Sequence, residues 1–284
     1  MRPPVATAGP ERRGAELARL RGDPSLPPDA SIVIPVNAQA DLESVLDVID
    51  EIASYEGQRT FEVVVVINNY PADQPPKELK TYAQAGMRTL GFPSLWRPGE
   101  VVSFTARVPG SREAASGFLI HFDADCRIGN SSVLLDWYVA QSERGMQAAY
   151  THVGYYDLRP VWSVRARIAI HHAARWLKRA VLRIPTIRGS NYAVDRSLFL
   201  SLYDRGLLTD DLNVGPAVKA GGGSIAYGRA RDLQVLTSGR RFRGGWLKLA
   251  RYLWYRTRYN IRVLPVRAPK PGEARNPFHE KPLR

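Results

Sequence analysis

Two aspartates separated by one residue, Asp123 and Asp125, carry the strongest chemical signal in the sequence. They follow directly on an apolar run at residues 117–122 that has the composition of a buried strand. Carboxylates spaced in this way can bind one hard cation together, and Mg²⁺ or Mn²⁺ prefers oxygen ligands and commonly binds substrate phosphates as well. The alternative is a pair of surface aspartates in a turn or a helix cap. We expect a divalent cation, Mn²⁺ or Mg²⁺, at Asp123 and Asp125, where it would stabilise a leaving diphosphate.

Alternating strands and helices must position this motif. β-Branched apolar runs at residues 31–36 and 61–67 predict strands buried on both faces, and the spacing of residues 41–54 predicts a helix between them, with Asp41 as its N-cap. The pattern continues with expected helices at 76–85, 110–116 and 131–144 and expected strands at 87–92, 117–122 and 146–153. This alternation predicts an α/β fold with a mostly parallel sheet that is covered on both sides.

Polar residues lie where three of these strands end. Asn37 follows the first strand, the pair Asn68-Asn69 follows the second, and the triplet Asp123-Ala124-Asp125 follows the strand at 117–122. Because ligands of parallel α/β sheets bind at the carboxyl ends of the strands, we expect these groups to share one site.

The second half of the chain is more helical and more basic. It predicts helices at 161–182, 196–203 and 244–260 and strands at 187–194, 224–227 and 233–236. We expect residues 1–29 to form a flexible leader with at most a short helix near 11–20. Residues 242–284 are expected to form a basic amphipathic helix and an irregular tail, which leaves 30–241 as the main domain.

Four short motifs follow one another along the sequence and carry a resemblance to a known family. They are Ser-Ile-Val-Ile-Pro-Val-Asn at 31–37, Ala106-Arg107 leading into Gly-Phe-Leu-Ile-His-Phe-Asp-Ala-Asp at 117–125, Gly189-Ser190-Asn191 followed by Asp210-Asp211, and Thr-Ser-Gly-Arg-Arg at 237–241. Together they resemble the family 2 glycosyltransferases, which are inverting enzymes with a GT-A fold. The resemblance implies that residues 30–126 are a nucleotide-binding half and residues 127–241 an acceptor-binding half.

The resemblance also implies a nucleotide-sugar donor and a role for each matched residue. Asp123 and Asp125 would bind the metal and the diphosphate. The residues expected at the nucleotide-sugar site are Pro35, Asn37, Asn68, Asn69, Arg107, Asp123 and Ala124, and those expected at the acceptor or sugar site are Gly189, Ser190 and Asn191.

The acidic pair Asp210-Asp211 has two interpretations. Its position before an apolar-bearing segment is typical of a helix N-cap. The resemblance instead implies that Asp211, the second acid, is the general base that takes the acceptor's hydroxyl proton during inverting transfer. Asp210 stands where the family has Glu, so both acids are candidates for the catalytic base.

Three departures from the family pattern leave roles open. Asn68-Asn69 stands where an aspartate commonly reads the nucleotide base, Arg112 competes with Arg107 for the phosphate, and no histidine metal ligand has a clear place, although Thr237-Ser238 stands near where it would lie. The Gln-x-x-Arg-Trp motif of processive synthases does not occur, so we expect non-processive transfer.

The charge balance indicates an anionic partner. The chain has 40 Lys and Arg against 27 Asp and Glu, which gives a formal net charge of +13. A single cysteine, Cys126, excludes an intrachain disulfide and a cysteine-based zinc site and fits a reducing compartment. No secretory signal or membrane span is evident, so we expect a cytoplasmic protein.

Two basic helical stretches, at 165–183 and 240–259, also carry Trp and Leu. We expect their apolar stripes to pack on the sheet while the basic residues are solvated. The stripe residues are Ile168, Trp176 and Leu177 in the first stretch and Trp246, Leu249, Leu253 and Trp254 in the second. The alternative is a peripheral contact with anionic lipid at the inner face of the membrane, which would suit a lipid-linked acceptor.

Two other function classes compete with a glycosyltransferase. A basic nucleic-acid-binding protein would account for the charge, but it would explain neither the β-α-β pattern nor the ordered acidic motifs. An inactive glycosyltransferase-like protein is consistent with Asn68-Asn69 at the base-reading position. We expect His152, His171 and His172 to be structural residues rather than metal ligands.

Overall fold

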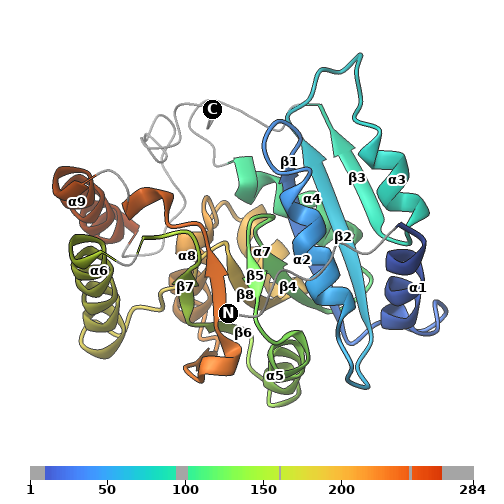
Figure 1. Cartoon of the computed structure of the whole chain (residues 1–284). Coiled ribbons are helices and arrows are strands. Elements are labelled where there is room, and N and C mark those ends of the chain that lie inside the picture. The colour runs from blue at the N-terminus through green and yellow to red at the C-terminus, as the bar shows by residue number, and fades with distance from the viewer. Residues whose placement is uncertain (1–9, 94–101, 160, 243–244, 264–284) are drawn as a thin grey trace.

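A computed structural model describes residues 10–93, 102–159, 161–242 and 245–263 (Figure 1). The helices are α1 (Pro10–Arg21), α2 (Ser44–Ala53), α3 (Glu78–Gln84), α4 (Val102–Glu113), α5 (Ser131–Glu143), α6 (Trp162–Ala180), α7 (Arg196–Asp204), α8 (Asp211–Ala220) and α9 (Gly245–Val263), with 3₁₀ turns η1 (Arg231–Leu233) and η2 (Arg240–Phe242). The strands are β1 (Ala30–Asn37), β2 (Phe61–Asn68), β3 (Arg88–Phe92), β4 (Phe118–Phe122), β5 (Arg127–Ile128), β6 (Ala148–Thr151), β7 (Val153–Tyr155), β8 (Asn191–Asp195), β9 (Ile225–Gly228) and β10 (Val235–Thr237).

Among the described residues, seven strands form one sheet in the order β3-β2-β1-β4-β8-β6-β9. β1 pairs in parallel with β2 and β4, and β2 pairs in parallel with β3, whereas β8 runs antiparallel to both β4 and β6. A smaller sheet joins β5, β10 and β7. The predicted α/β fold with a mostly parallel sheet is confirmed.

The side chains of the large sheet alternate between two cores. In β1, Ile32, Ile34 and Val36 pack into the core shared with α1, α2, α3 and α5, whereas Val33 points into the core shared with α4, α7 and α8. Because helices cover both faces, β1 and β2 are buried along nearly their whole length rather than at alternate positions. The carboxyl ends of β1, β2 and β4 remain at one edge, where the polar residues predicted for the site are found.

Helices α6 and α9 lie apart from the two cores of the large sheet. No described residue of either helix belongs to the two cores, and the two helices lie side by side at the edge of the molecule (Figure 1). None of the described helices combines the length and the apolar composition that a membrane span requires. The expected tail at residues 268–284 lies outside the described residues.

The expected flexible leader does not extend over residues 10–21, which form α1. Leu17 and Leu20 of this helix are buried in the first core. Arg13 makes a buried ion pair with Asp50 of α2, with 2.9 Å between Arg13 Nη2 and Asp50 Oδ2. The short helix predicted near residues 11–20 is therefore present and fixed by packing, while residues 1–9 lie outside the described part.

Three predicted elements have different bounds. The short helix expected at 110–116 is the end of α4, which begins at Val102 and includes Pro109 in its interior. The strand expected at 146–153 divides into β6 and β7, which belong to different sheets, and the strand expected at 187–194 begins only at Asn191. Hydrogen bonds from the site hold residues 189 and 190 in a loop, as described below.

Asp41 is not the N-cap of α2. The cap position belongs to Glu43, whose side chain makes no capping hydrogen bond. Asp41 Oδ2 instead accepts a hydrogen bond from the backbone N–H of Asn37, at 3.3 Å, at the end of β1. Asp41 thus stabilises the turn after the first strand rather than the start of the helix.

Candidate active site

The side chain of Arg107, on α4, is completely buried at the carboxyl edge of the sheet. Its Nε donates to Asp211 Oδ1 at 2.9 Å, and its Nη2 donates to Asp123 Oδ1 at 2.5 Å. Nη1 and Nη2 also donate to the carbonyl oxygens of Phe122, at 3.0 Å, and Gly189, at 2.7 Å. One guanidinium therefore connects the predicted metal motif, the predicted acceptor loop and the predicted base.

The charge of Arg107 depends on its two carboxylate partners. Burial by itself lowers the pKa of this guanidinium, but Asp211 and Asp123 outweigh burial and raise the pKa above its ordinary value. The group therefore stays charged inside the protein. Arg112, its competitor in the sequence, lies on the surface and pairs with Asp204 at 2.5 Å, so it takes no part in this arrangement.

Asp210 and Asp211 have separate roles, although they are neighbours in the chain. Asp210 is the N-cap of α8 and forms a capping box with Asn213, so the cap interpretation holds for this residue. Asp211 is buried, and its Oδ1 also accepts a hydrogen bond from the hydroxyl of Tyr192 at 3.1 Å. Burial raises the pKa of Asp211 to about 6, even though Arg107 opposes this rise. A carboxyl group of this kind is suited to accept a proton near neutral pH.

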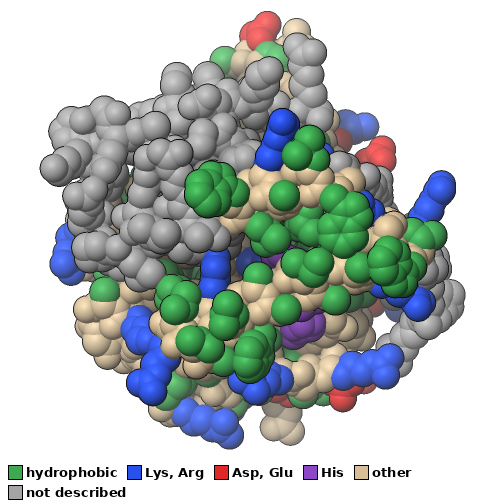
Figure 2. All heavy atoms as spheres, turned by 90° about the vertical axis from the view of Figure 1, so that its left-hand side faces the viewer, with side chains coloured by type: hydrophobic (Ala, Val, Ile, Leu, Met, Phe, Trp, Pro, Cys, Tyr) green, Lys and Arg blue, Asp and Glu red, His purple; other side chains and the backbone are tan. Residues whose placement is uncertain are grey.

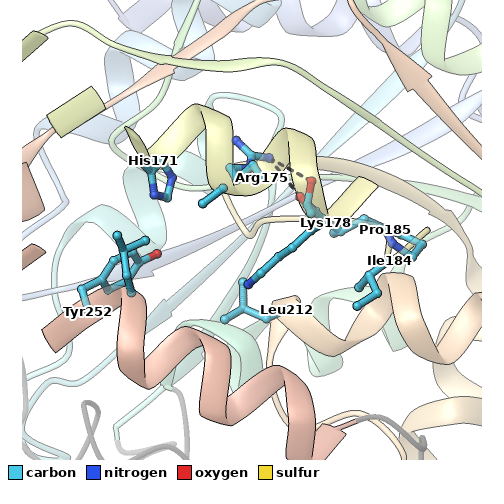
Figure 3. Close-up of a pocket in the computed structure, with 11 residues that line it drawn as sticks. His171, Arg175, Lys178, Ile184, Pro185, Leu212 and Tyr252 are labelled. Carbon is cyan, nitrogen blue, oxygen red and sulfur yellow. Dashed lines mark hydrogen bonds between the residues drawn. The ribbon is translucent and has the colours of Figure 1, made fainter. Parts of the chain in front are cut away.

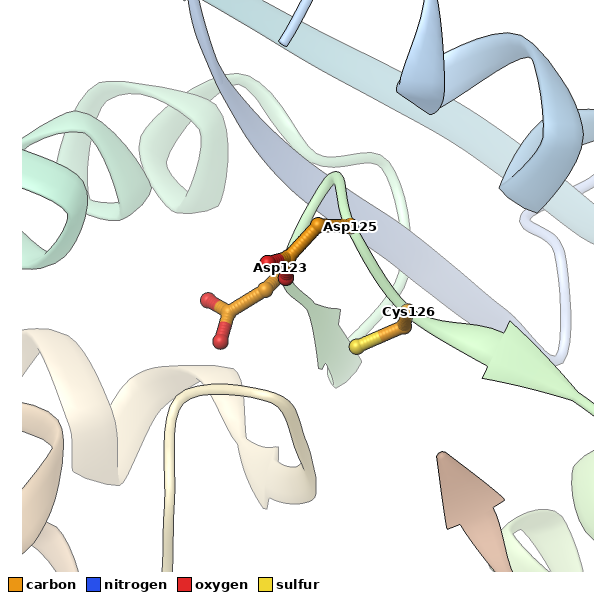
Figure 4. Close-up of side chains that lie close together, drawn as sticks. All are labelled: Asp123, Asp125 and Cys126. Carbon is orange, nitrogen blue, oxygen red and sulfur yellow. The ribbon is translucent and has the colours of Figure 1, made fainter. Parts of the chain in front are cut away.

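Asp123, Asp125 and Cys126 lie together on the turn between β4 and β5 (Figure 4). One potential ligand atom from each residue lies within 4.8 Å of the others. Burial raises the pKa of the Cys126 thiol well above its usual value, and Sγ donates to the carbonyl oxygen of Ser190 at 3.0 Å. A neutral, hydrogen-bonded thiol is a poor ligand for a hard cation, whereas the two partly exposed carboxylates fit Mg²⁺ or Mn²⁺.

Residues of the closing motif surround Asp125. Arg240 Nη2 donates to Asp125 Oδ2 at 2.9 Å, and the Thr237 hydroxyl lies 3.5 Å from Asp125 Oδ1. Thr237 therefore stands beside the carboxylate, in the region where the sequence left a third metal ligand open. The hydroxyl of Ser238 instead donates to Asp157 at 2.7 Å.

The polar residues after β1 and β2 meet at the same edge of the sheet. Asn69 Nδ2 donates to Asn37 Oδ1 at 3.1 Å, and Asn69 has a left-handed backbone conformation with φ of 65°. Asn68 is buried, and its Oδ1 has no hydrogen-bond partner among the described residues. Pro35 is buried within β1, and Ala124 is buried between the two aspartates. Because Asn68 Oδ1 is itself buried, it is not open to a ligand in this structure.

The predicted acceptor loop supports the site through its backbone. Gly189 and Ser190 use their carbonyl oxygens to accept from Arg107 and Cys126. Asn191 is buried and bonded to Tyr138 and Thr151, which fixes the start of β8. The structure thus brings these residues to the site, but it buries the Asn191 side chain in a structural role.

Sequence reasoning missed three residues at this site, namely Tyr192, Arg240 and Asp41. Tyr192 follows the predicted loop directly, and Arg240 belongs to the predicted closing motif, so both were close to a recognised signal. Burial raises the pKa of the Asp41 carboxyl, and the charges of Arg240 and Asp123 also act on this group. A polar residue four positions after Asn37, at the same strand end, is the signal that would have indicated it.

A pocket lies between α6, α9 and the start of α8 (Figure 3). Its lining residues are His171, Ala174, Arg175, Lys178, Ile184, Pro185, Thr186, Ile187, Leu212, Tyr252 and Leu253. Lys178 extends from α6 toward Leu212, which follows Asp211 in the chain. The lining includes basic residues and no carboxylate, so the pocket is suited to an anionic group.

Arg175 is the buried centre of this basic region. Its Nη2 donates to the carbonyl oxygen of Thr186 at 3.0 Å. Burial, together with the nearby charges of Arg188 and Arg179, lowers the pKa of Arg175 to about 9. In the described part of the chain, none of the ion pairs involves these three arginines. The positive charge of these three arginines is therefore not balanced by a carboxylate in an ion pair within the described residues.

The histidines near this region contact other aromatic rings. His152 and His172 lie with ring centroids 4.9 Å apart, and His171 lies 5.3 Å from Phe242. Burial lowers the pKa of His172 to about 4, with His152 contributing in the same direction. Among the described residues, the cluster of potential metal ligands contains none of these histidines. The structure thus shows these histidines in ring contacts, and their assignment as structural residues stays a prediction.

A scan against models of known protein families found no match, and a sequence search of curated proteins found none either. Among solved structures, the chain is similar to glucosyl-3-phosphoglycerate synthase from Mycobacterium tuberculosis in complex with Mn²⁺, UDP and phosphoglyceric acid. The TM-score is 0.50, the sequence identity is 19%, and the match covers 92% of this chain and 82% of that one. For the same enzyme with Mn²⁺, UDP-glucose and glycerol 3-phosphate, the TM-score is 0.50 and the sequence identity is 20%, and the match covers 94% of this chain and 86% of that chain. At this level of identity the likeness concerns the fold, which is the predicted GT-A fold.

The close approach at Gly189 generates a testable prediction. A Cβ atom at this position would lie 2.4 Å from Asp211 Oδ2 and 2.9 Å from Arg107 Nη2, so Gly189→Ala must displace the buried ion pair. We expect the free energy of unfolding to fall by about 1–3 kcal/mol, the usual cost of overpacking a buried region, as measured by urea denaturation.

The matched control is Gly117→Ala, because an added Cβ there meets nothing within 4 Å. This variant should unfold at nearly the same urea concentration as the parent protein. Equal stability of the two variants would show that the loop does not approach Asp211 as closely as the structure indicates.

Proposed function

We propose that this protein is a metal-dependent glycosyltransferase that moves a sugar from a nucleoside diphosphate to an acceptor hydroxyl, without processive synthesis. The observation that carries the proposal is the guanidinium of Arg107, which contacts both Asp123 of the metal motif and Asp211. Arg107 thus holds together Asp123, which belongs to the carboxylate pair proposed for the diphosphate side, and Asp211, the buried carboxyl proposed for the acceptor side. The GT-A fold and the Mn²⁺ and UDP-glucose in the complexes of the similar enzyme support this assignment.

We assign the donor side to Asp123, Asp125 and the asparagines at the ends of β1 and β2. Asp123 and Asp125 would hold the cation, which when bound supplies positive charge that stabilises the leaving diphosphate. Asn37 and Asn69, which are partly exposed at the ends of β1 and β2, would contact the nucleotide base. Arg107 is completely buried, so its role is to position Asp123 and Asp211 rather than to bind phosphate directly.

We assign the role of general base to Asp211, which makes the transfer inverting. The acceptor oxygen attacks the anomeric carbon from the face opposite the diphosphate, and the bond between that carbon and the diphosphate oxygen breaks with its electron pair on the diphosphate. The acceptor's proton passes to Asp211 Oδ2, since Oδ1 already accepts from Arg107 and Tyr192. Asp210 is excluded from this step because its side chain caps α8.

We also propose that the acceptor carries a phosphate or carboxylate group. The lining of the basic pocket includes Leu212, which follows Asp211 in the chain, together with Arg175 and Lys178, and none of the lining residues is Asp or Glu. An acceptor with its anionic group in this pocket would therefore reach toward the proposed base with its hydroxyl. The similar enzyme has phosphoglyceric acid or glycerol 3-phosphate in its complexes, which agrees with this class of acceptor.

A thermal-shift screen tests the donor and the metal. One among UDP-, GDP- and dTDP-sugars should raise the melting temperature in the presence of Mn²⁺, by about 5 °C or more at a ligand concentration near 100 times Kd. Asp125→Ala should abolish this shift, because it removes one of the two proposed ligands. Asp204→Ala, an exposed aspartate on α7, is the control and should respond like the parent.

The same screen separates the alternatives. A parent protein that responds to none of these donors contradicts the proposal and favours an inactive glycosyltransferase-like protein. Strongly salt-dependent binding of DNA or RNA, together with no response to donors, would favour the nucleic-acid-binding class instead.

The pH dependence of transfer tests the base. Because Asp211 must be ionised to accept a proton and its pKa is about 6, kcat/KM should fall as the pH is lowered through 6. Asp211→Asn should reduce kcat by at least about 100-fold, whereas Asp210→Asn should keep most of the activity, since Asn is also a good N-cap.

The anomeric configuration of the product provides the decisive control for this assignment. NMR of the product should show the anomer opposite to that of the donor. A retained anomer would overturn the inverting mechanism and leave Asp211 as a positioning partner of Arg107, while the transferase activity itself would stand.

Calorimetry with phosphoglyceric acid tests the anionic pocket. Lys178→Met should weaken binding of this probe about tenfold, the loss expected for one charge-assisted hydrogen bond. Lys80→Met, at an exposed position of α3, should leave binding unchanged. Equal binding by all three proteins, or no binding by the parent, would contradict an anionic acceptor at this pocket.

A further inference from the structure

Helix α6 buries basic side chains and exposes large apolar ones, which is the reverse of the usual arrangement. The residues it buries include Arg167, His171 and Arg175. Its large apolar residues point away from the protein, with Trp162 78% exposed and Trp176 57% exposed. Ile170, Leu177 and Val181 are exposed on the same helix or at its end. The expectation that the apolar stripe packs on the sheet while the basic residues are solvated is therefore wrong for α6.

Helix α9 extends this apolar surface. Trp246, Leu247 and Trp254 are exposed, and Trp254 is 71% exposed, whereas Leu249 is buried as predicted. The guanidinium of Arg167 lies 5.7 Å from the centre of the Trp246 ring and links the two helices. Figure 2 shows hydrophobic side chains gathered across this side of the molecule, over the two helices that lie at the left of Figure 1. We call the exposed residues of α6 and α9 the α6–α9 face.

Basic residues surround the exposed aromatic rings. Arg165, Arg183, Lys248 and Arg251 are exposed along the two helices and just after α6. The chain has no Asp or Glu between Asp157 and Asp195, and none between Asp232 and Glu273. Acidic side chains appear in Figure 2 only toward the margins of the view. The α6–α9 face therefore combines apolar area with positive charge and has no acidic residue of its own.

We propose that the α6–α9 face docks on an anionic lipid surface. Trp side chains favour the boundary between headgroups and acyl chains, and each Lys or Arg near an anionic leaflet adds attraction. A second copy of this chain would bring two positively charged faces together, which like-charge repulsion disfavours. None of the exposed residues of the α6–α9 face belongs to the candidate active site, so this inference does not depend on the proposed reaction.

Docking would also place the basic pocket near the lipid. Residues of both helices line that pocket, including Arg175 and Lys178 from α6 and Tyr252 from α9. The inward face of α6 thus carries the buried charge, and its outward face carries the exposed apolar side chains. The same helix would serve the acceptor side of the site and the membrane.

Co-sedimentation of the full chain with lipid vesicles tests the proposal. Binding to vesicles of phosphatidylglycerol and phosphatidylcholine should exceed binding to phosphatidylcholine alone, and it should weaken at high salt. The double variant Trp176→Ser and Trp254→Ser should lose at least about tenfold in affinity, since it removes two exposed apolar anchors. Both side chains are largely exposed, so the melting temperature should be retained.

The matched control is the double variant Leu26→Ser and Val133→Ser, which removes exposed apolar side chains that lie elsewhere on the surface. It should bind vesicles like the parent. Charge is tested separately with Arg165→Gln and Lys248→Gln, which should reduce the preference for the anionic vesicles. If the tryptophan variant fails to fold, a blue shift of tryptophan emission in the parent on anionic vesicles gives the second readout.

Four results would overturn the proposal. They are no binding by the parent, equal binding to neutral vesicles, unchanged binding by the tryptophan variant, and no blue shift of emission on vesicles. A fifth is self-association in solution that the tryptophan variant abolishes, as measured by sedimentation velocity. That result would assign the α6–α9 face to a second copy of this chain.

Discussion

The buried guanidinium of Arg107 holds together parts of the site that the sheet alone would leave separate. Its partners are Asp123 and the carbonyl of Phe122 at the end of β4, the carbonyl of Gly189, and Asp211 at the start of α8. A buried charge costs several kcal/mol unless carboxylates and hydrogen bonds compensate it, and here both kinds of partner are present. Without Arg107, the buried carboxylate of Asp211 and the partly exposed carboxylate of Asp123 would both lose this cationic partner.

This arrangement couples the two sides of the proposed reaction. Arg107 shares the Asp123 carboxylate with the proposed cation and shares Asp211 with the proposed acceptor. Burial keeps the pKa of Asp211 near 6, although Arg107 favours its ionised form. In the proposed reaction, the donor side and the proposed base are thus connected through a single side chain.

The sheet, and the position of the Asp123-Ala124-Asp125 triplet at the end of a buried strand, could be predicted because their signals are local. The apolar runs of β1 and β2 and the Asp123-Ala124-Asp125 triplet are each visible within ten residues. The partners of Arg107 could not be predicted from spacing, since Asp211 is 104 positions away and the contact depends on how α4 and α8 pack. Asp210 and Asp211 show the same limit, because one caps a helix and its neighbour enters the site, and residue type cannot separate the two roles.

Helix α6 shows why periodicity does not determine orientation. The spacing of its apolar residues predicts a stripe, but the direction in which the stripe faces depends on what lies beneath the helix. Beneath α6 lie Arg188, Thr186 and the basic pocket rather than an apolar core, so Arg175 and His171 turn inward and find polar contacts there. The tryptophans must then face outward. If an anionic ligand in the pocket balances the charge of Arg175 and lipid covers the outward stripe, both faces of α6 have a partner from outside the described part of the chain.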